Sequence, residues 1–306
     1  MSLTVVGSIA FDAVKTPFGE RERMLGGAAV HFSLAASFFT EVRPVGPVGD
    51  DFGADEFAVL ERRGVIVEDV ERVEGGQSFF WRGRYEYDLN VAHTEDTQLG
   101  VFAEFEPKLS PASQAADTLF LANIQPDLQR QVRAQCTAAQ LSGLDSMNLW
   151  IETAKDSLEA AISEVDVLVV NDAEIRMLTG ESNLARAARA VMDMGPRAVV
   201  AKQGEYGAAL FTGSGFFALP GFPLEDVRDP TGAGDSFAGG FFGYLDSVEE
   251  IDDHELRRAM GYGTVLASFN VEEFGTERVA RLTREEIDSR FEDLRSMTQF
   301  EGPVAS

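Results

Sequence analysis

Short apolar runs alternate with segments of helical periodicity along most of this chain. Apolar runs that end at turn residues predict buried strands, and apolar spacings of three and four predict helices. A repeated strand-then-helix order predicts a mostly parallel sheet covered by helices on both faces. Strands are predicted in 3–12, 118–124, 141–148, 165–171, 197–204 and 207–211, and helices in 26–39, 126–139, from 235 onward and in two closing segments; 41–65 reads as strand, turn and helix.

Residues 76–107 depart from this alternation. The stretch QSFFWRGRYEYDLNVAH is aromatic and alternating, which is typical of half-covered antiparallel strands. Together with residues 12–24 we interpret it as a small β-sheet lid that is inserted into the main domain. Internal repeats are not evident. The sequence therefore predicts a single α/β domain over 1–306, with a central mostly parallel sheet and a small lid.

The charge balance limits the partners of this chain. It carries 51 acids against 26 bases, for a formal net charge of −25. The negative electrostatic potential of a protein with this net charge disfavours non-specific binding to nucleic acid or to anionic membranes. We expect adaptation to high salt, and the alternative is an ordinary acidic cytosolic protein. The N-terminus has no signal pattern, and one cysteine, Cys136, suits a reducing compartment, so we expect a cytoplasmic protein.

The stretch DPTGAGDSFAGGFF combines a turn with a helix start. Pro230 cannot continue a strand, and Gly232 and Gly234 allow a tight turn with unusual dihedral angles. The backbone amides at a helix N-terminus are unpaired and carry partial positive charge, so they bind anions. Glycines remove the Cβ atoms that would keep a phosphate from these amides. The pattern predicts an anion site at the start of this helix.

Asp235 conflicts with a purely anion-binding role, because a carboxylate repels a phosphate. It is explained if the carboxylate accepts a proton from a hydroxyl group as that oxygen attacks phosphorus. The alternative is that Asp235 only caps the helix. The stretch therefore favours phosphoryl transfer, with the capping role left open.

Five segments, in order, resemble the ribokinase-like (PfkB) family of carbohydrate and nucleoside kinases. DPTGAGDSFAGGF resembles the C-terminal signature of that family, and GGAAVHFS resembles its N-terminal glycine-pair signature. GSIAFD, NDAE and VVAKQGEYGAALF match its first strand, its NxxE motif and its nucleotide-side strands. The resemblance covers residues 3–294. It implies a ribokinase-like fold and an ATP-dependent kinase that phosphorylates a hydroxymethyl group of a sugar or nucleoside, with ATP as co-substrate and Mg²⁺ as cofactor.

The resemblance also implies roles for residues on the nucleotide side. Asp235 would be the catalytic base, and the amides of Gly232, Ala233 and Gly234 would form the anion hole. Asn171 and Glu174 would organise Mg²⁺ through water, although Asn171 could simply be a helix cap. Lys202 would offset the triphosphate charge, or is merely an exposed lysine. Gly204 and Gly207 would let the backbone approach the nucleotide or only form a turn, and Thr231 is a further nucleotide-side candidate.

On the acceptor side, Asp12 is expected at the end of the first strand, where its carboxylate could accept two hydrogen bonds from a vicinal diol. The alternative is an acid in a surface turn. Gly26 and Gly27 would approach the same ring. His31 departs from the family, in which many members carry asparagine, and it is a substrate-binding candidate or a core histidine. Further candidates at strand ends are Asn123, Asp145 and Asn148.

The aromatic segment 79–87 is expected to close over the substrate and exclude water. Arg82 and Arg84 would share one face and bind an anionic group or pair with acids. Exposed aromatic residues there could form a homodimer interface. The stretch ASFNVEEFG and Asp229 resemble a monovalent-cation site, which suggests K⁺.

Three alternative functions differ in the motifs that they need. A catalytically inactive sensor of nucleotide or sugar would not need the GAGD and NxxE motifs, and a sugar-phosphate kinase would differ only in its acceptor. A dinucleotide-binding oxidoreductase is disfavoured because no GxGxxG follows the first strand. The sequence leaves the acceptor open.

Overall fold

Two β-sheets organise the computed structural model, which describes residues 1–299. The large sheet has nine strands in the order β13-β12-β11-β10-β9-β8-β1-β4-β5. Its strands pair in parallel from β11 to β5, and the pairs β11–β12 and β12–β13 are antiparallel. The strands are β1 (Ser2–Val6), β4 (Glu41–Val48), β5 (Val70–Arg72), β8 (Thr118–Leu121), β9 (Leu141–Asp145), β10 (Val167–Asn171), β11 (Ala198–Lys202), β12 (Ala208–Thr212) and β13 (Gly215–Leu219).

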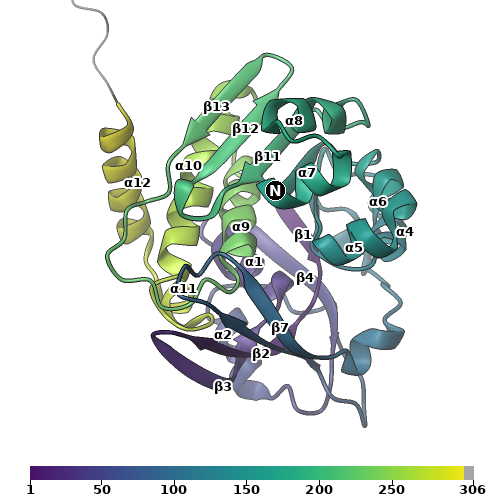
Figure 1. Cartoon of the computed structure of the whole chain (residues 1–306). Helices are drawn as coiled ribbons and strands as arrows, with labels where there is room; N and C mark the ends of the chain where they lie inside the picture. Colours follow the sequence, from purple (N-terminus) through teal and green to yellow (C-terminus); the bar gives the residue numbers. More distant parts are fainter. Residues whose placement is uncertain (300–306) are drawn as a thin grey trace, which may run out of the picture.

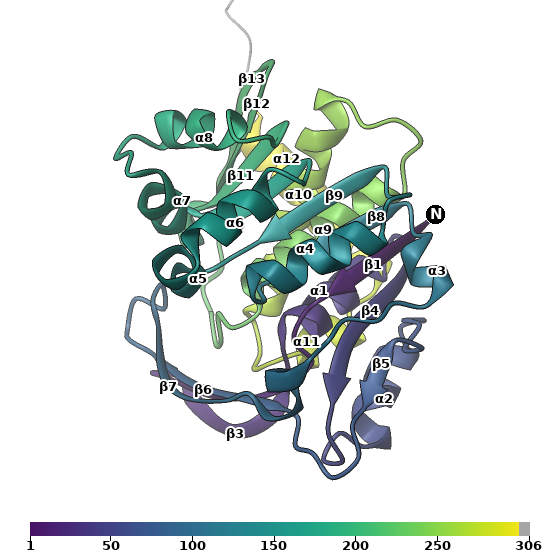
Figure 2. The ribbon, with the colours of Figure 1, turned by 90° about the vertical axis from the view of Figure 1, so that its right-hand side faces the viewer.

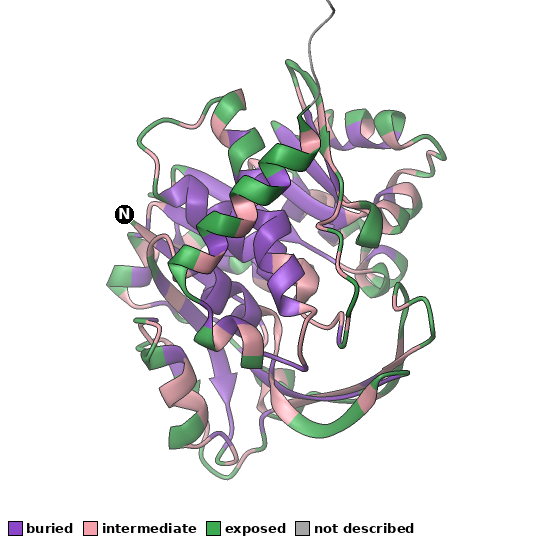
Figure 3. Ribbon diagram, turned by 90° about the vertical axis from the view of Figure 1, so that its left-hand side faces the viewer, coloured by how far each residue is buried: buried purple, intermediate pink, exposed green. Residues whose placement is uncertain are grey.

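The small sheet lies at one end of the large one (Figure 2). Its order is β3-β2-β6-β7, with β2 (Ala10–Thr16), β3 (Gly19–Gly26), β6 (Phe79–Tyr85) and β7 (Ala92–Gln98). The pairs β2–β3 and β6–β7 are antiparallel, whereas β2 and β6 are parallel. The strand β3 forms an exposed outer edge (Figure 3). The predicted second sheet is confirmed, and its role as a lid stays a prediction.

Helices cover both faces of the large sheet, as predicted (Figure 1). One apolar core joins the sheet to α1, α2 and α9–α12, and a second core joins its other face to α4–α8. None of the helices in residues 1–299 combines the length and the hydropathy needed to cross a membrane. The cytoplasmic location stays a prediction. The helices are α1 (Ala28–Ala36), α2 (Ala54–Glu61), η1 (Gly100–Glu104), α3 (Pro111–Gln114), α4 (Pro126–Gln135), α5 (Asn148–Thr153), α6 (Lys155–Ile162), α7 (Asp172–Thr179), α8 (Leu184–Met192), η2 (Gly204–Tyr206), α9 (Ala233–Asp246), α10 (Asp253–Asn270), α11 (Glu277–Arg281) and α12 (Arg284–Thr298).

Glycines, which have no side chain, let α1 and α9 pack closely against each other and against the sheet. A Cβ at Gly239 of α9 would lie 2.3 Å from the Phe32 carbonyl oxygen of α1. A Cβ at Gly143 of β9 would lie 2.1 Å from the Phe242 ring of α9. The Phe32 ring stacks on Phe120, and both contact Phe242. This aromatic layer fixes both helices against the centre of the sheet.

The first predicted strand was wrong in one respect. Residues 3–12 do not form one strand, because the chain leaves the large sheet after Val6 and enters the small sheet at Ala10. A Cβ at Gly7, inside the break, would lie 2.8 Å from the Ala122 Cβ, so only glycine fits this crossing. Asp12 therefore belongs to the small sheet and not to the end of the first strand.

Smaller differences concern the later elements. The helix α9 begins at Ala233, two residues before the predicted start, and its N-cap is Gly232. The edge strand β13 was not predicted, because it is short and half exposed. After α9 the described residues, up to 299, form three helices rather than two, since the short α11 separates α10 from α12.

The salt dependence of stability tests the expectation of halophily. Because the net charge is −25, repulsion between surface carboxylates should destabilise the fold in dilute buffer. Screening within about 3 Å at 1 M salt should relieve this repulsion. We expect the melting temperature to rise by several degrees between 0.2 and 2 M salt. Thermal unfolding is measured in NaCl and in KCl, because screening is common to both salts whereas specific K⁺ binding occurs only in KCl. A melting temperature independent of salt would contradict the expectation of halophily.

Candidate active site

The turn before α9 is built around Gly232. Its φ of 74° is left-handed, and a Cβ there would lie 2.3 Å from Nδ1 of His31. A non-glycine residue would therefore meet both backbone strain and the imidazole ring. The Asn270 side-chain amide donates to the Thr231 carbonyl at 2.7 Å, and Oγ of Ser236 donates to Oδ1 of Asn270 at 3.0 Å. Side chains of α1, α9 and α10 thus hold this turn in place.

His31 is a core residue with 2% exposure. Its Nδ1 lies 3.0 Å from Oδ1 of Asn270, whose amide nitrogen already donates to the turn. The Nδ1 atom must therefore carry the proton and donate. Burial lowers the pKa of His31 to about 4, so the ring is neutral at pH 7. Its buried Nε2 has no hydrogen-bond partner among the described residues. The geometry fits the alternative of a core histidine, and contact with substrate stays a prediction.

Asp235 lies in the first turn of α9 and is half-buried. Apart from its own backbone amide, its carboxylate accepts no hydrogen bond from the residues described. Burial and the neighbouring Asp145 raise its pKa to about 7, although Lys202 opposes this shift. The carboxylate is not satisfied as an ordinary helix cap would be, and it can take up a proton near neutral pH.

The backbone amides of the turn are not equally free. The Ala233 amide donates to the Pro230 carbonyl at 3.2 Å, so it is already used within the turn. The amides of Gly232 and Gly234 have no backbone acceptor among the described residues. The structure differs here from the expectation of three available amides, because the chain closes a turn just before the helix.

Lys202 brings a positive charge to the same place. Its Nζ lies 3.3 Å from Oδ2 of Asp145, and the two side chains are only 18% and 8% exposed. The same Nζ is 2.8 Å from the position that a Cβ at Gly234 would occupy. Burial opposes the charge, but Asp145 and Glu174 outweigh it and raise the pKa of Lys202. It is therefore a charged, positioned lysine rather than a freely exposed one.

Asn171 and Glu174 form a reciprocal cap at the start of α7. Oδ1 of Asn171 accepts from the Glu174 amide at 2.8 Å, and Oε2 of Glu174 accepts from the Asn171 amide at 2.8 Å. The capping alternative therefore holds for both residues. Burial and Asp145 raise the pKa of Glu174 to about 7. Its second oxygen, which has no protein partner in the described part of the chain, remains able to bind a metal-bound water.

Asp12 projects from β2 toward this turn and is 5% exposed. A Cβ at Gly26 would lie 2.0 Å from its Oδ2, so Gly26 makes room for this carboxylate, whereas a Cβ at Gly27 would lie 2.5 Å from the Ser8 carbonyl oxygen. Burial, Asp229 and Asp235 raise its pKa to about 7. The predicted acceptor side and the predicted base therefore meet, and the surface-turn alternative is wrong because Asp12 is buried within a strand.

Asp229 is fully buried beneath the turn. One oxygen accepts from the Thr231 amide at 2.9 Å and the other from the Gly275 amide at 3.0 Å. No lysine or arginine in the described residues pairs with it. It clamps the turn before α9 to the loop after α10, and burial raises its pKa.

The other predicted residues lie at the edge of this group. Oδ1 of Asn123 accepts from the Trp150 indole at 2.9 Å, and Asn148 is exposed at the start of α5. A Cβ at Gly207 would lie 2.0 Å from the Leu219 carbonyl oxygen, so strand packing alone explains this glycine. A Cβ at Gly204 would lie 2.6 Å from Oδ1 of Asn90, which is in the loop between β6 and β7.

The predicted lid segment is more enclosed than expected. Phe79, Phe80 and Trp81 are half-buried rather than exposed. Arg82 pairs with Glu22 at 2.9 Å, and Arg84 pairs with Glu86 and Glu95, so both arginines follow the alternative of pairing with acids.

Two residues of the site were missed. The Tyr85 hydroxyl accepts from Oγ1 of Thr231 at 3.2 Å and links the small sheet to the turn. Asn270 supports the same turn from α10. A buried asparagine in an otherwise apolar helix end was a usable signal for Asn270. Nothing in the alternating pattern distinguished Tyr85 from the neighbouring aromatic residues.

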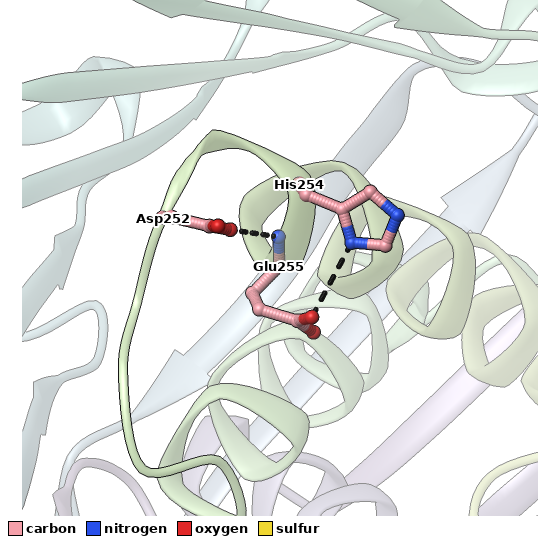
Figure 4. A group of neighbouring side chains, drawn as sticks. All are labelled: Asp252, His254 and Glu255. Carbon is pink, nitrogen blue, oxygen red and sulfur yellow. Dashed lines mark hydrogen bonds and ion pairs between the residues drawn. The ribbon is translucent and has the colours of Figure 1, made fainter.

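A separate group of possible metal-ligating types, Asp252, His254 and Glu255, lies at the N-terminus of α10 (Figure 4). Oδ1 of Asp252 accepts from the Glu255 amide at 2.8 Å, and Nδ1 of His254 lies 3.3 Å from Oε1 of Glu255. Helix capping and one exposed pair account for this arrangement, which lies apart from the site.

Comparisons with known proteins show what the whole chain resembles. Residues 3–281 match the profile of pfkB family carbohydrate kinases. The chain is 28% identical over 250 residues to a cytidine kinase of Thermococcus kodakarensis, which covers 79% of this chain and 87% of that protein.

Two solved structures share the fold. A nucleoside kinase of Burkholderia thailandensis in complex with inosine has a TM-score of 0.77 at 22% identity, covering 95% of this chain and 97% of the other. A protein of E. coli described as ribokinase II, in complex with ATP and Mg²⁺, has a TM-score of 0.77 at 17% identity, covering 95% and 99%. The predicted fold is confirmed.

Proposed function

The chain belongs to the pfkB family of carbohydrate kinases, and on that premise we propose that Asp235 is the general base of phosphoryl transfer to a hydroxymethyl group. The protein is an ATP-dependent carbohydrate or nucleoside kinase whose acceptor is an alcohol. The acceptor would lie beside Asp12 and the triphosphate beside Lys202. Asp235, in the first turn of α9, would face both.

One observation carries this proposal. The Lys202 ammonium lies against the first turn of α9, although two positive groups repel each other. Asp145 and Glu174 hold the ammonium in this place. The ammonium and the amides of Gly232 and Gly234, which are unpaired among the described residues, would together bind an anion between them. A transferred phosphoryl group is such an anion, and it would place its phosphorus beside the unsatisfied carboxylate of Asp235.

The remaining residues would act in a simple order. Asp12 would accept hydrogen bonds from acceptor hydroxyls and orient the reacting oxygen toward Asp235. Asp235 would take the proton of that hydroxyl as the oxygen attacks. The amides of Gly232 and Gly234 would stabilise the charge that develops on the transferred group. The small sheet would exclude water from the reacting groups, and its aromatic residues could also support a homodimer.

Two cations fit the acids of the site. Asp145 and Glu174 together exceed the single charge of Lys202, so a hydrated Mg²⁺ held through Glu174 and Asn171 would balance the site. Mg²⁺ would neutralise charge on the triphosphate. Asp229 is a buried carboxylate without a cationic partner in residues 1–299, which fits K⁺ near the turn. We propose both cations on these grounds.

An assay of ATP consumption tests the function. Purified protein with Mg²⁺ is offered pooled free sugars, sugar phosphates and nucleosides, and the products are identified by mass. We expect acceptor-dependent ADP formation and an acceptor that gains one phosphoryl group. An inactive sensor would bind an acceptor without consuming ATP, and that result would remove the proposal.

Lys202→Met should strongly reduce turnover with ATP. It removes the cation beside the proposed phosphoryl site and leaves Asp145 without its partner. We expect a fall in kcat/KM for ATP of about 100-fold, comparable to losing one charge-stabilising group. Because Lys202 lowers the pKa of Asp235, the acidic limb of the pH profile should move to higher pH. Lys155→Met, which alters a partly exposed lysine, is the control; equal losses in both variants would contradict the role.

A further inference from the structure

One face of the small sheet carries Trp81, a residue that the proposed chemistry leaves without a role. Trp81 pairs with Asp12 across β6 and β2, so both side chains lie on one face of the sheet. Alternation along β6 places Gly83 and Tyr85 on that same face. Because Tyr85 reaches Thr231 and Asp12 lies near Asp235, this face is turned toward the proposed reacting groups.

The Trp81 indole lies over Gly83 on this face. Its ring atoms come within 2.1 Å of the position that a Cβ at Gly83 would occupy, so the glycine provides the space for the ring. The indole Nε1 donates to Oγ1 of Thr94 on β7 at 3.1 Å, which fixes the ring orientation. No aromatic ring in residues 1–299 stacks on this indole. The result is a half-buried, planar surface beside the Asp12 carboxylate.

The charges around Asp12 define the acceptor further. The charged groups that act on Asp12 are the carboxylates of Asp229 and Asp235, and no cation is among them. The two arginines of β6 alternate onto the opposite face and pair with acids. A phosphate group already present on the acceptor would therefore be repelled by these carboxylates, with no positive group to offset the repulsion. This side of the site favours a neutral acceptor that offers hydroxyl groups.

Resting on the proposed function, we propose that the acceptor is a nucleoside, with its base stacked on Trp81 and its ribose diol on Asp12. A planar base covers an indole well, and stacking tolerates different bases because each has a π-face. A free pentose would satisfy Asp12 but leave the indole uncovered. A sugar phosphate would face the acids around Asp12. The Trp81 side chain is thus the specificity-determining surface.

Binding without turnover tests this proposal. The chain has two tryptophans, Trp81 and Trp150, so the difference between native protein and Trp81→Phe isolates the fluorescence of Trp81. Without ATP and in molar salt, cytidine and inosine are titrated in parallel with ribose and ribose 1-phosphate. We expect saturable quenching of Trp81 by the nucleosides and dissociation constants for the two sugars at least tenfold weaker by calorimetry. Ribose or ribose 1-phosphate binding as tightly as the nucleosides would overturn the proposal.

Variants at the indole sharpen the test. Trp81→Leu should weaken nucleoside binding by about tenfold or more, as expected for loss of one stacked base, and leave ribose binding unchanged. Trp81→Phe retains an aromatic ring, so its nucleoside affinity should fall less than that of Trp81→Leu. An unchanged nucleoside affinity in Trp81→Leu would contradict the proposal. If circular dichroism shows that Trp81→Leu does not fold, the proposal is tested instead by the quenching of Trp81 fluorescence and by the nucleoside affinity of Trp81→Phe.

The same measurements separate this proposal from the proposed function. Nucleosides that bind and quench Trp81 but are never phosphorylated would support the stacking site and remove the kinase mechanism. Phosphorylation of a free sugar, with a KM that Trp81→Leu does not change, would support the mechanism and remove the nucleoside assignment.

Discussion

Asp235→Asn is expected to reduce kcat by about 1,000-fold, within the range for loss of a general base. The amide has nearly the same shape but cannot take the proton of the attacking hydroxyl. Nucleotide binding should be retained or tighter, because a negative charge beside the phosphates is removed. Single-turnover kinetics and calorimetry with an ATP analogue measure the two effects separately.

The stability and the pH profile provide controls for this variant. Burial raises the pKa of Asp235 to about 7, so the folded protein holds a proton that the unfolded chain loses near pH 4. The ionised form therefore lowers the free energy of unfolding as pH rises from about 4 through 7. Asp235→Asn should melt no lower than the native protein at pH 8. The native kcat/KM should fall below about pH 7, and near-native turnover in the variant would exclude the general base.

Gly232→Ala is expected to reduce kcat by about 100-fold, comparable to the loss of one donor of an anion hole. Two effects combine at this position. Alanine is strained at a φ of 74°, and its Cβ would lie 2.3 Å from Nδ1 of His31. Relief of this overlap must move the turn or the imidazole, and either movement displaces the amides before α9. Steady-state kinetics with saturating substrates measure the loss.

Gly64→Ala is the matched control for this variant. Gly64 has a φ of 75° and open space around its Cβ position, so the substitution imposes the strain without the overlap. Gly64→Ala should lower the melting temperature slightly and leave kcat unchanged. Equal kinetic losses at both positions would show that general destabilisation, rather than the position of the turn, controls activity.

The sequence was sufficient to predict the architecture, because its parallel strands are continuous apolar runs between periodic helices. Local pattern could not show the break after Val6, since the need for Gly7 arises from packing against Ala122, far along the chain. For the same reason one buried strand was expected where the chain passes between two sheets. The pattern within a segment predicts its own secondary structure, but not which other segments it packs against.

The site was predictable to a similar extent. Asp12 and Asp235 were predicted from strand-end and turn patterns, and Asp229 only from the family resemblance. The structure brings Asp12 close enough for the charges of the other two to raise its pKa. The pairing of Lys202 with Asp145 was not predictable, because it joins the ends of two strands 57 residues apart. The support of the turn by His31 and Asn270 joins residues 239 apart in the same way.

The contact between Asn90 and Gly204 has a consequence for the fate of ATP. The hairpin that carries Trp81 and Tyr85 beside the proposed acceptor site ends in a loop whose Asn90 lies against Gly204, in the strand connection following Lys202. One hairpin would therefore contact both proposed binding compartments. When ATP is bound without an acceptor, we expect it to be accessible to water but not aligned for attack. Hydrolysis of ATP by water should therefore stay slow until the acceptor binds.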